Sequence, residues 1–179
     1  MAQATQAGRA LAAAGTMPDA IASSDLVRAR STAGLIAAEL GYRRPLVVDP
    51  DLREQDLGDW NGLTSDEMAA LWPSQLDARR SGRLDEVPGG EAGPVFAARC
   101  LGALERLAAS GADETVVVAH GGVIIALERA LGLWRDGNRH GHLAGWWVEG
   151  KGTPPDLELV ALGHGDLLAP QPETVTGPA

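Results

Sequence analysis

The stretch TVVVAHGGVIIALERAL, residues 115–131, decides the fold class of this protein. Its β-branched run at 115–118 predicts a strand buried on both faces, and residues 123–131 have the length and leucine spacing of a helix. His120 and two glycines join them. Open α/β sheets bind ligands at the carboxyl ends of their strands, and a helix start offers N–H groups to an anion. His120 is therefore a candidate ligand-binding residue, although a structural turn capped by this histidine explains the stretch equally well.

Composition indicates a globular protein with a single core. The 179 residues are 45% hydrophobic and 22% charged, and the formal net charge is −9. This charge, without any basic cluster, argues against nucleic acid and acidic membranes as partners. The first residues do not resemble a secretory signal, and no apolar run approaches membrane-spanning length. We expect a cytoplasmic protein.

Cys100 is the only cysteine. It recurs with apolar residues at helical spacing, which predicts core packing rather than a reactive thiol. A single cysteine forms neither an intrachain disulfide nor a cysteine zinc site, in keeping with the cytoplasm.

Strands and helices alternate along the chain up to residue 131. Residues 2–14 favour a helix, 19–24 a strand, and Asp25 is placed to cap a helix that runs to about Leu40, where Gly41 stops it. The next elements we expect are a strand at 46–49, a short helix between a Thr64–Glu67 capping box and Pro73, a surface excursion at 73–92 and a long helix from about Pro94 to Ala109. This order predicts a three-layer α/β/α sandwich with a mostly parallel sheet.

The last part of the chain differs in character. Residues 134–142 are polar and predict a loop, whereas 143–149 and 157–162 predict an antiparallel pair at a sheet edge. Trp146 and Trp147 then face opposite sides of their strand, one toward the core. We expect one domain at 1–168 and a disordered tail at 169–179.

Three polar residues follow the three predicted parallel strands. Arg28, Glu54 and His120 each come after the carboxyl end of one strand, so they should share one rim of the sheet. An arginine and a histidine can hold phosphoryl oxygens, and a carboxylate near bound phosphate can act as acid and base. Taken alone, each residue is more easily explained as structural: Arg28 as a solvated helix residue, Glu54 as a loop charge and His120 as a cap. Their shared rim makes them a candidate site.

Four motifs extend this interpretation. SSDLVRARSTA (23–33), LREQDLGDWNG (52–62), PGGE (88–91) and VVVAHGG (116–122) resemble, in order and spacing, motifs of the histidine phosphatase superfamily, also called the phosphoglycerate mutase-like family. The amino-acid sequences of these motifs look most similar to those of glucosyl-3-phosphoglycerate phosphatases. The resemblance covers most of the chain up to about residue 132.

The resemblance implies a role for each matching residue. Arg28 matches the second phosphate-binding arginine of the family and His120 its second histidine, and both are counted as catalytic. Gly121 matches a glycine whose backbone N–H binds phosphate. Glu54 matches the proton donor that protonates the leaving oxygen and then activates water. The chemistry is metal-independent, so neither a metal nor another cofactor is expected.

One family motif has no match in this sequence. The family opens with a central strand ending in Arg-His-Gly, whose histidine becomes phosphohistidine, and we expect this strand to lie upstream of Met1. His164, in the strand-like run LELVALGHGD (157–166), could replace that histidine only through a circular permutation. His140 and His142 are interpreted as solvated loop residues.

The predicted activity is hydrolysis of a phosphoric monoester through phosphohistidine, with the nucleophile segment absent from this chain. The alternatives are a phosphoglycerate mutase and a noncatalytic module that binds a phosphorylated ligand. The expected partner is a small phosphorylated metabolite, and the resemblance allows a homodimer.

Overall fold

A computed structural model of the chain describes residues 1–80, 86–134, 140–152 and 158–167. The elements in chain order are α1 (Ala2–Ala13), β1 (Ala20–Ser23), α2 (Val27–Glu39), β2 (Val47–Val48), the 3-10 helices η1 (Pro50–Leu52) and η2 (Gly58–Trp60), α3 (Ser65–Leu71), α4 (Pro73–Arg80), α5 (Gly93–Ala108), β3 (Thr115–Val118), α6 (Gly121–Ala130), β4 (Ala144–Lys151) and β5 (Glu158–Asp166).

The three strands predicted to be parallel form one sheet in the order β2-β1-β3. Ile21 in β1 lies opposite Val116 in β3, and all pairings in this sheet are parallel. Strand β2 has two residues, fewer than the four expected; Asp49 still donates its N–H to the carbonyl of Ser23, and Pro50 then starts η1. Proline has no N–H to donate to a ladder, so the strand ends before it.

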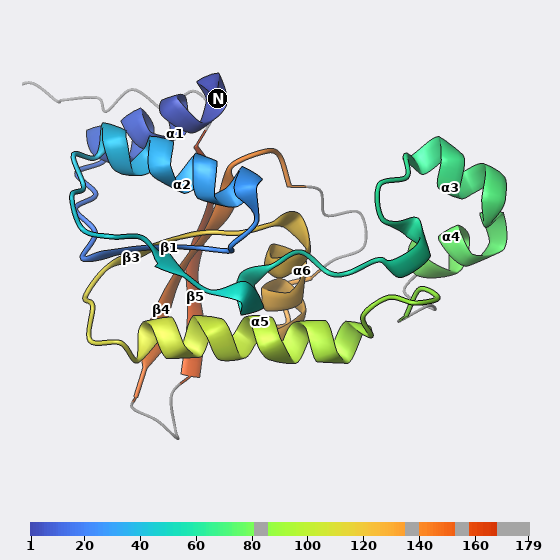
Figure 1. Cartoon of the computed structure of the whole chain (residues 1–179). Coiled ribbons are helices and arrows are strands. Elements are labelled where there is room, and N and C mark those ends of the chain that lie inside the picture. Colours follow the sequence, from blue (N-terminus) through green and yellow to red (C-terminus); the bar gives the residue numbers. More distant parts are fainter. Residues whose placement is uncertain (81–85, 135–139, 153–157, 168–179) are drawn as a thin grey trace, which may run out of the picture.

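Helices cover both faces of this sheet (Figure 1). Ile21 packs with α1 and α2 on one face, whereas the next residue, Ala22, packs with Leu52 and with Ala103 and Leu107 of α5 on the other. Successive strand residues point to opposite faces, so the alternation places one helix layer on each side. The three-layer α/β/α prediction is confirmed.

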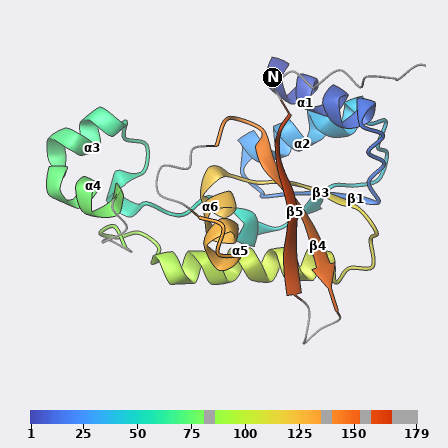
Figure 2. The same cartoon turned by 180° about the vertical axis from the view of Figure 1, so that it is seen from behind.

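Strands β4 and β5 form a separate antiparallel sheet, not the edge of the main sheet that we expected. The two strands cross the direction of the α5 axis at a steep angle (Figure 2). Within the described ranges β3 pairs only with β1, and β4 only with β5, so each has one unpaired edge. As predicted, the two tryptophans differ: Trp146 is half-buried, and Trp147 is 52% exposed.

Helix boundaries follow local sequence signals, with one exception. Gly41 and Gly111 have φ angles of 66° and 81° after α2 and α5, where a left-handed residue ends a helix. Thr64 forms the predicted capping box of α3. Asp25 does not cap α2, which starts from Leu26 without a side-chain cap; its carboxylate instead binds the guanidinium of Arg53.

The excursion at 73–92 contains a helix, α4, that we did not predict. With α3 it forms a lobe beside the sheet (Figure 1), built around Trp60, Leu76 and Val87. The expected tail at 169–179 lies outside the described residues. In the part of the chain that is described, no helix has the length and apolarity to cross a membrane.

Candidate active site

His120 is held between the ends of two neighbouring strands. It follows β3, and its Nε2 lies 2.7 Å from Oγ of Ser24, the residue after β1. Both residues are buried. Burial lowers the pKa of His120 below its usual value, and the nearby charge of Arg28 lowers it further, while Glu54 acts in the opposite direction. Burial therefore favours the neutral form of His120, and the contact with Ser24 orients the ring.

Arg28 lies directly beside this histidine. In the first turn of α2, its Nε donates a hydrogen bond of 3.3 Å to Nδ1 of His120. Because Nδ1 accepts, the neutral ring carries its proton on Nε2 and donates it to Ser24. The other N–H groups of Arg28 have no partner among the described residues, and the side chain is exposed. They are free to bind an anion.

Glu54 approaches the same point from the third strand end. Its carboxylate accepts hydrogen bonds from the backbone N–H of Gln55 at 3.0 Å and of Gly122 at 3.3 Å. The structure thus brings together Arg28, Glu54 and His120, as the shared rim predicted. Gly121 begins α6, and its N–H has no partner among the described residues.

A glycine is required where the carboxylate meets the helix. A Cβ on Gly122 would collide with Oε1 of Glu54 and lie 3.1 Å from Cζ of Phe96. The second glycine of the HGG motif therefore leaves room for the Glu54 carboxylate above the start of α6.

The motifs LGDWNG and PGGE meet through their backbones. Gly58 has a φ of 51°, and a Cβ there would collide with the backbone of Gly89 and Gly90. The N–H of Asp59 donates to the carbonyl of Pro88 at 3.1 Å. This close approach brings the PGGE loop against the segment that follows Glu54.

The remaining histidines lie elsewhere. His140, which we expected in solvent, is largely buried: its Nε2 lies 3.0 Å from Oε2 of Glu128. The other oxygen of this carboxylate, Oε1, accepts a hydrogen bond of 2.9 Å from Nε1 of Trp146. His142 is exposed, as expected. His164 lies within β5, opposite Trp146, rather than at a strand end, which removes the reason for proposing a permuted nucleophile there.

Cys100 is a core residue, as predicted. It is fully buried and packs with Phe96, Val123 and Ala126. Burial raises the pKa of its thiol to about 11, so the reactive thiolate is scarce at neutral pH. Among the described residues there is also no group of three or more His, Cys, Asp or Glu side chains that could hold a metal ion.

Several residues that build the site were missed by sequence reasoning. Ser24 follows a parallel strand at the same rim as Arg28, so its position was a usable signal. Arg99 and Glu91 form an ion pair at 2.6 Å beside the Glu54 segment. Nothing in the local sequence of α5 marks Arg99, because the backbone carbonyls that it binds are 45 to 48 residues away in the chain.

Comparison with known proteins identifies a family and several relatives. Residues 1–146 match the histidine phosphatase superfamily, branch 1. The chain is 45% identical over 112 residues to phosphoglycerate mutase-like protein 4 of Arabidopsis thaliana, covering 60% of this chain and 48% of the relative. It is 44% identical over 125 residues to glucosyl-3-phosphoglycerate phosphatase of Mycobacterium tuberculosis, covering 64% and 54%.

A solved structure shares the fold. The complex of a mycobacterial glucosyl-3-phosphoglycerate phosphatase with inorganic phosphate superposes with a TM-score of 0.71 and 33% identity, covering 89% of this chain and 82% of the other. The chain spans about half the length of the two curated relatives, from Arabidopsis thaliana and Mycobacterium tuberculosis. With the match over residues 1–146 and the shared α/β fold, the chain belongs to the histidine phosphatase superfamily.

Proposed function

We propose that this protein contributes the phosphate-binding and acid–base residues of a metal-independent phosphoric monoester hydrolase. The observation that carries the proposal is the convergence of three side chains at one rim: the Nε of Arg28 lies 3.3 Å from Nδ1 of His120, and Glu54 lies over the N–H of Gly122. Arg28, His120 and the free N–H of Gly121 bind the phosphoryl oxygens. Glu54 transfers protons.

The reaction requires a nucleophile that the described residues do not place at this site. We propose that the nucleophile is a histidine in an Arg-His-Gly strand preceding Met1. The unpaired edges of β3 and β4 support the addition of one strand.

In the first step, a nitrogen of that histidine attacks phosphorus and the bond from phosphorus to the leaving oxygen breaks. Protonated Glu54 supplies the proton that the leaving oxygen takes up. In the second step, the Glu54 carboxylate removes a proton from water, whose oxygen attacks the phosphohistidine. The P–N bond breaks, and the products are inorganic phosphate and the free histidine.

Hydrolysis of p-nitrophenyl phosphate tests the proposal. We would compare this chain, a chain extended upstream by the Arg-His-Gly strand, and Glu54→Gln and His120→Gln variants of the extended chain. Turnover by the extended chain, with a loss of about 100-fold or more in either variant, is expected. An active extended chain whose rate is unaffected by both substitutions would contradict the roles of Glu54 and His120.

The same samples separate the two alternatives. A phosphoglycerate mutase would interconvert 2- and 3-phosphoglycerate, which phosphorus NMR detects directly. A noncatalytic module would bind inorganic phosphate in the wild-type form and would lose this binding in the Arg28→Met variant. Neither the 179-residue chain nor the extended chain would then hydrolyse p-nitrophenyl phosphate.

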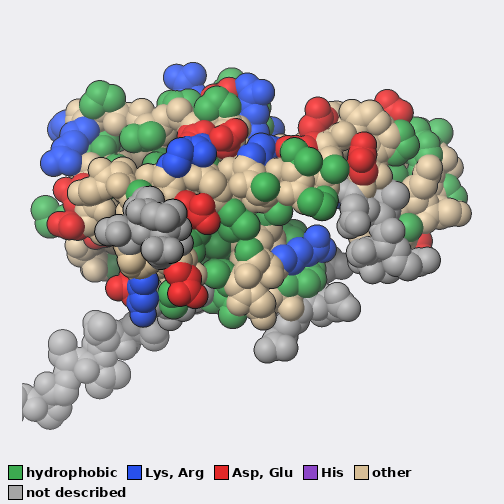
Figure 3. All heavy atoms as spheres, turned by 90° about the horizontal axis from the view of Figure 1, so that it is seen from below, with side chains coloured by type: hydrophobic (Ala, Val, Ile, Leu, Met, Phe, Trp, Pro, Cys, Tyr) green, Lys and Arg blue, Asp and Glu red, His purple; other side chains and the backbone are tan. Residues whose placement is uncertain are grey.

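The proposed substrate is a small phosphorylated metabolite. The net charge of −9 opposes nucleic acid and acidic membranes, and the face seen from below carries basic side chains scattered among acidic and hydrophobic ones (Figure 3). A cytoplasmic location and a homodimer remain predictions. Light scattering on the eluting protein measures the oligomeric state.

A further inference from the structure

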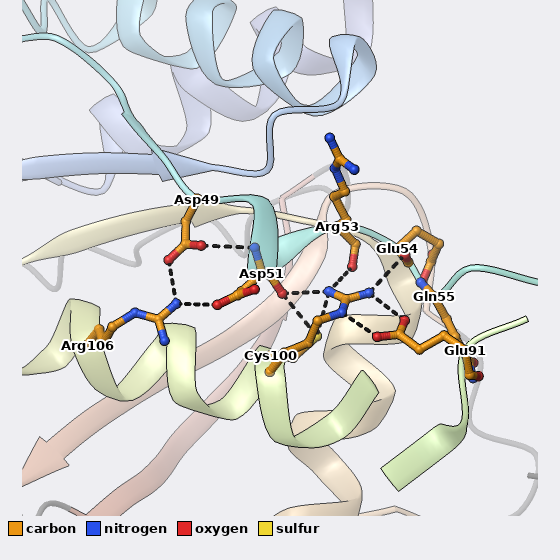
Figure 4. Close-up of polar contacts among 9 residues, drawn as sticks. Asp49, Asp51, Arg53, Glu54, Gln55, Glu91, Cys100 and Arg106 are labelled. Atoms are coloured by element: carbon orange, nitrogen blue, oxygen red, sulfur yellow. Dashed lines mark hydrogen bonds and ion pairs between the residues drawn. The ribbon is translucent and has the colours of Figure 1, made fainter. Parts of the chain in front are cut away.

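One arginine outside the proposed site binds the backbone that carries Glu54. Arg99, on α5, donates from Nη1 to the carbonyls of Asp51 at 2.7 Å and Arg53 at 2.9 Å, and from Nη2 to the carbonyl of Glu54 at 3.2 Å. In Figure 4 the labelled Asp51, Arg53 and Glu54 lie around one guanidinium, to which their dashed lines run. Three carbonyls of a four-residue segment therefore share one cation.

Glu91 completes this cluster. Its carboxylate accepts two hydrogen bonds from Arg99, at 2.6 Å from Nε and 2.7 Å from Nη2. This bidentate pair raises the pKa of Arg99 above its usual value. Both side chains are mostly buried, with 20% of Arg99 and 16% of Glu91 exposed, so the pair is better protected from screening than one on the surface.

The backbone of Glu91 binds the segment on the other side of Glu54. Its N–H donates to the carbonyl of Asp56 at 2.8 Å, and its carbonyl accepts from Nε2 of Gln55 at 2.8 Å. Glu54 thus lies where the stretch bound by Arg99, residues 51–54, meets the stretch bound by the backbone of Glu91, residues 55–56.

The Glu54 side chain itself has little to hold it. Its carboxylate accepts only two backbone N–H groups and forms no salt bridge among the described residues. The position of the carboxylate over Gly122 is consequently set by the main chain beneath it. A shift of about 1 Å in this backbone would move the carboxylate out of hydrogen-bond reach.

We propose that the Arg99–Glu91 pair is a positioning device that holds Glu54 in place for proton transfer. The inference rests on the proposed function. Arg99 does not touch the reacting atoms; it acts through the carbonyls of residues 51–54. Arginine suits this task because its planar guanidinium presents five N–H donors in a fixed fork, whereas lysine presents a point charge on a flexible stem.

Arg106 offers a matched control on the same helix. It lies two turns after Arg99 and binds the side chains of Asp49 at 2.9 Å and Asp51 at 2.7 Å, at the start of the same segment. Its hydrogen bonds within the described part of the chain go to these two carboxylates and not to the backbone of residues 53–54. Arg106→Lys therefore reports what the same arginine-to-lysine exchange on this helix does where the arginine binds carboxylates and not the backbone of residues 53–54.

The first experiment needs no turnover. In the 179-residue chain, the NMR chemical shift of the Gly122 amide should change with pH as Glu54 takes up a proton. The Glu54→Gln variant shows which part of this change is due to Glu54 and which part is due to His120. We expect Arg99→Lys and Glu91→Gln to lose most of the Glu54-dependent shift and Arg106→Lys to keep it. Folding of each variant is checked by circular dichroism. A full Glu54-dependent shift in folded Arg99→Lys and Glu91→Gln would overturn the proposal.

The second experiment uses the chain that hydrolyses p-nitrophenyl phosphate. Phenyl phosphate has a more basic leaving group and depends more on a general acid. We expect Arg99→Lys to lower kcat for phenyl phosphate about tenfold more than for p-nitrophenyl phosphate, with KM little changed. Equal losses on both substrates would mean that Arg99 serves stability alone. If no chain turns over, the proposed function fails, while the Gly122 titration still decides whether Arg99 positions Glu54.

Discussion

Oγ of Ser24 lies 2.7 Å from Nε2 of His120, a short hydrogen bond between the residues that follow two neighbouring parallel strands. Because Arg28 donates to the other ring nitrogen, this serine is the acceptor for the single proton of the neutral ring. The bond couples the ends of β1 and β3 and sets the face that the imidazole turns toward a ligand.

Replacement of Ser24 by alanine should release the imidazole. We expect Ser24→Ala to weaken binding of inorganic phosphate by about 1 kcal/mol, roughly fivefold, the usual value of one hydrogen bond. Calorimetric titration measures the affinity. Ser23→Ala is the control, because its hydroxyl bonds only the carbonyl of Ser24, at 2.6 Å, and is also buried. Equal losses in the two variants would argue against a specific role for Ser24.

The lowered pKa of His120 predicts a pH-dependent stability. In the unfolded chain this histidine binds a proton near pH 6.5, whereas in the folded chain it does so only at lower pH. The unfolded state therefore binds more protons between these two values, and the free energy of unfolding falls as pH drops below about 6.5. Urea unfolding between about pH 7.5 and 5 measures this loss. His120→Gln should show a smaller loss than the wild type, and identical curves would contradict the prediction.

Two glycine substitutions separate stability from activity. Gly122→Ala places a methyl group against Glu54 and Phe96, so we expect kcat to fall about tenfold or more in a chain that turns over. Its free energy of unfolding should change by less than about 1 kcal/mol, because a side-chain end can move away. Gly34→Ala, in open space on α2, should add about 0.5–1 kcal/mol of stability without changing kcat. Full activity of Gly122→Ala would argue against the placement of Glu54.

The buried carboxylate of Glu128 should matter for stability. It is completely buried and accepts from Trp146 and His140, which connects α6 to β4 and to the segment just before β4. We expect Glu128→Ala to lower the free energy of unfolding by about 3 kcal/mol, because two polar partners lose a buried acceptor. Glu128→Gln keeps a carbonyl for Trp146 and should cost less. Denaturation followed by tryptophan fluorescence distinguishes them, and an equal cost for both would contradict this account.

The fold and the rim of the site were predictable because they depend on local pattern. The β-branched run TVVV at 115–118 is typical of a strand. A parallel α/β sheet brings the carboxyl ends of its strands to one edge. Arg28, Glu54 and His120 could therefore be grouped before any coordinates were known. Asp25 was assigned wrongly as a helix cap because its actual partner, Arg53, is 28 residues away.

What the sequence alone determined is the order of elements, the three-layer fold and the choice of residues at the carboxyl ends of the strands. These follow from periodicity, turn residues and motif spacing, which act over a few residues. Only the tertiary structure decided that β4 and β5 form their own sheet, that His140 is buried against Glu128, and that Arg99 holds the backbone of Glu54. Such contacts join side chains that are distant in sequence, and their partners are selected by packing and burial, which no local pattern records.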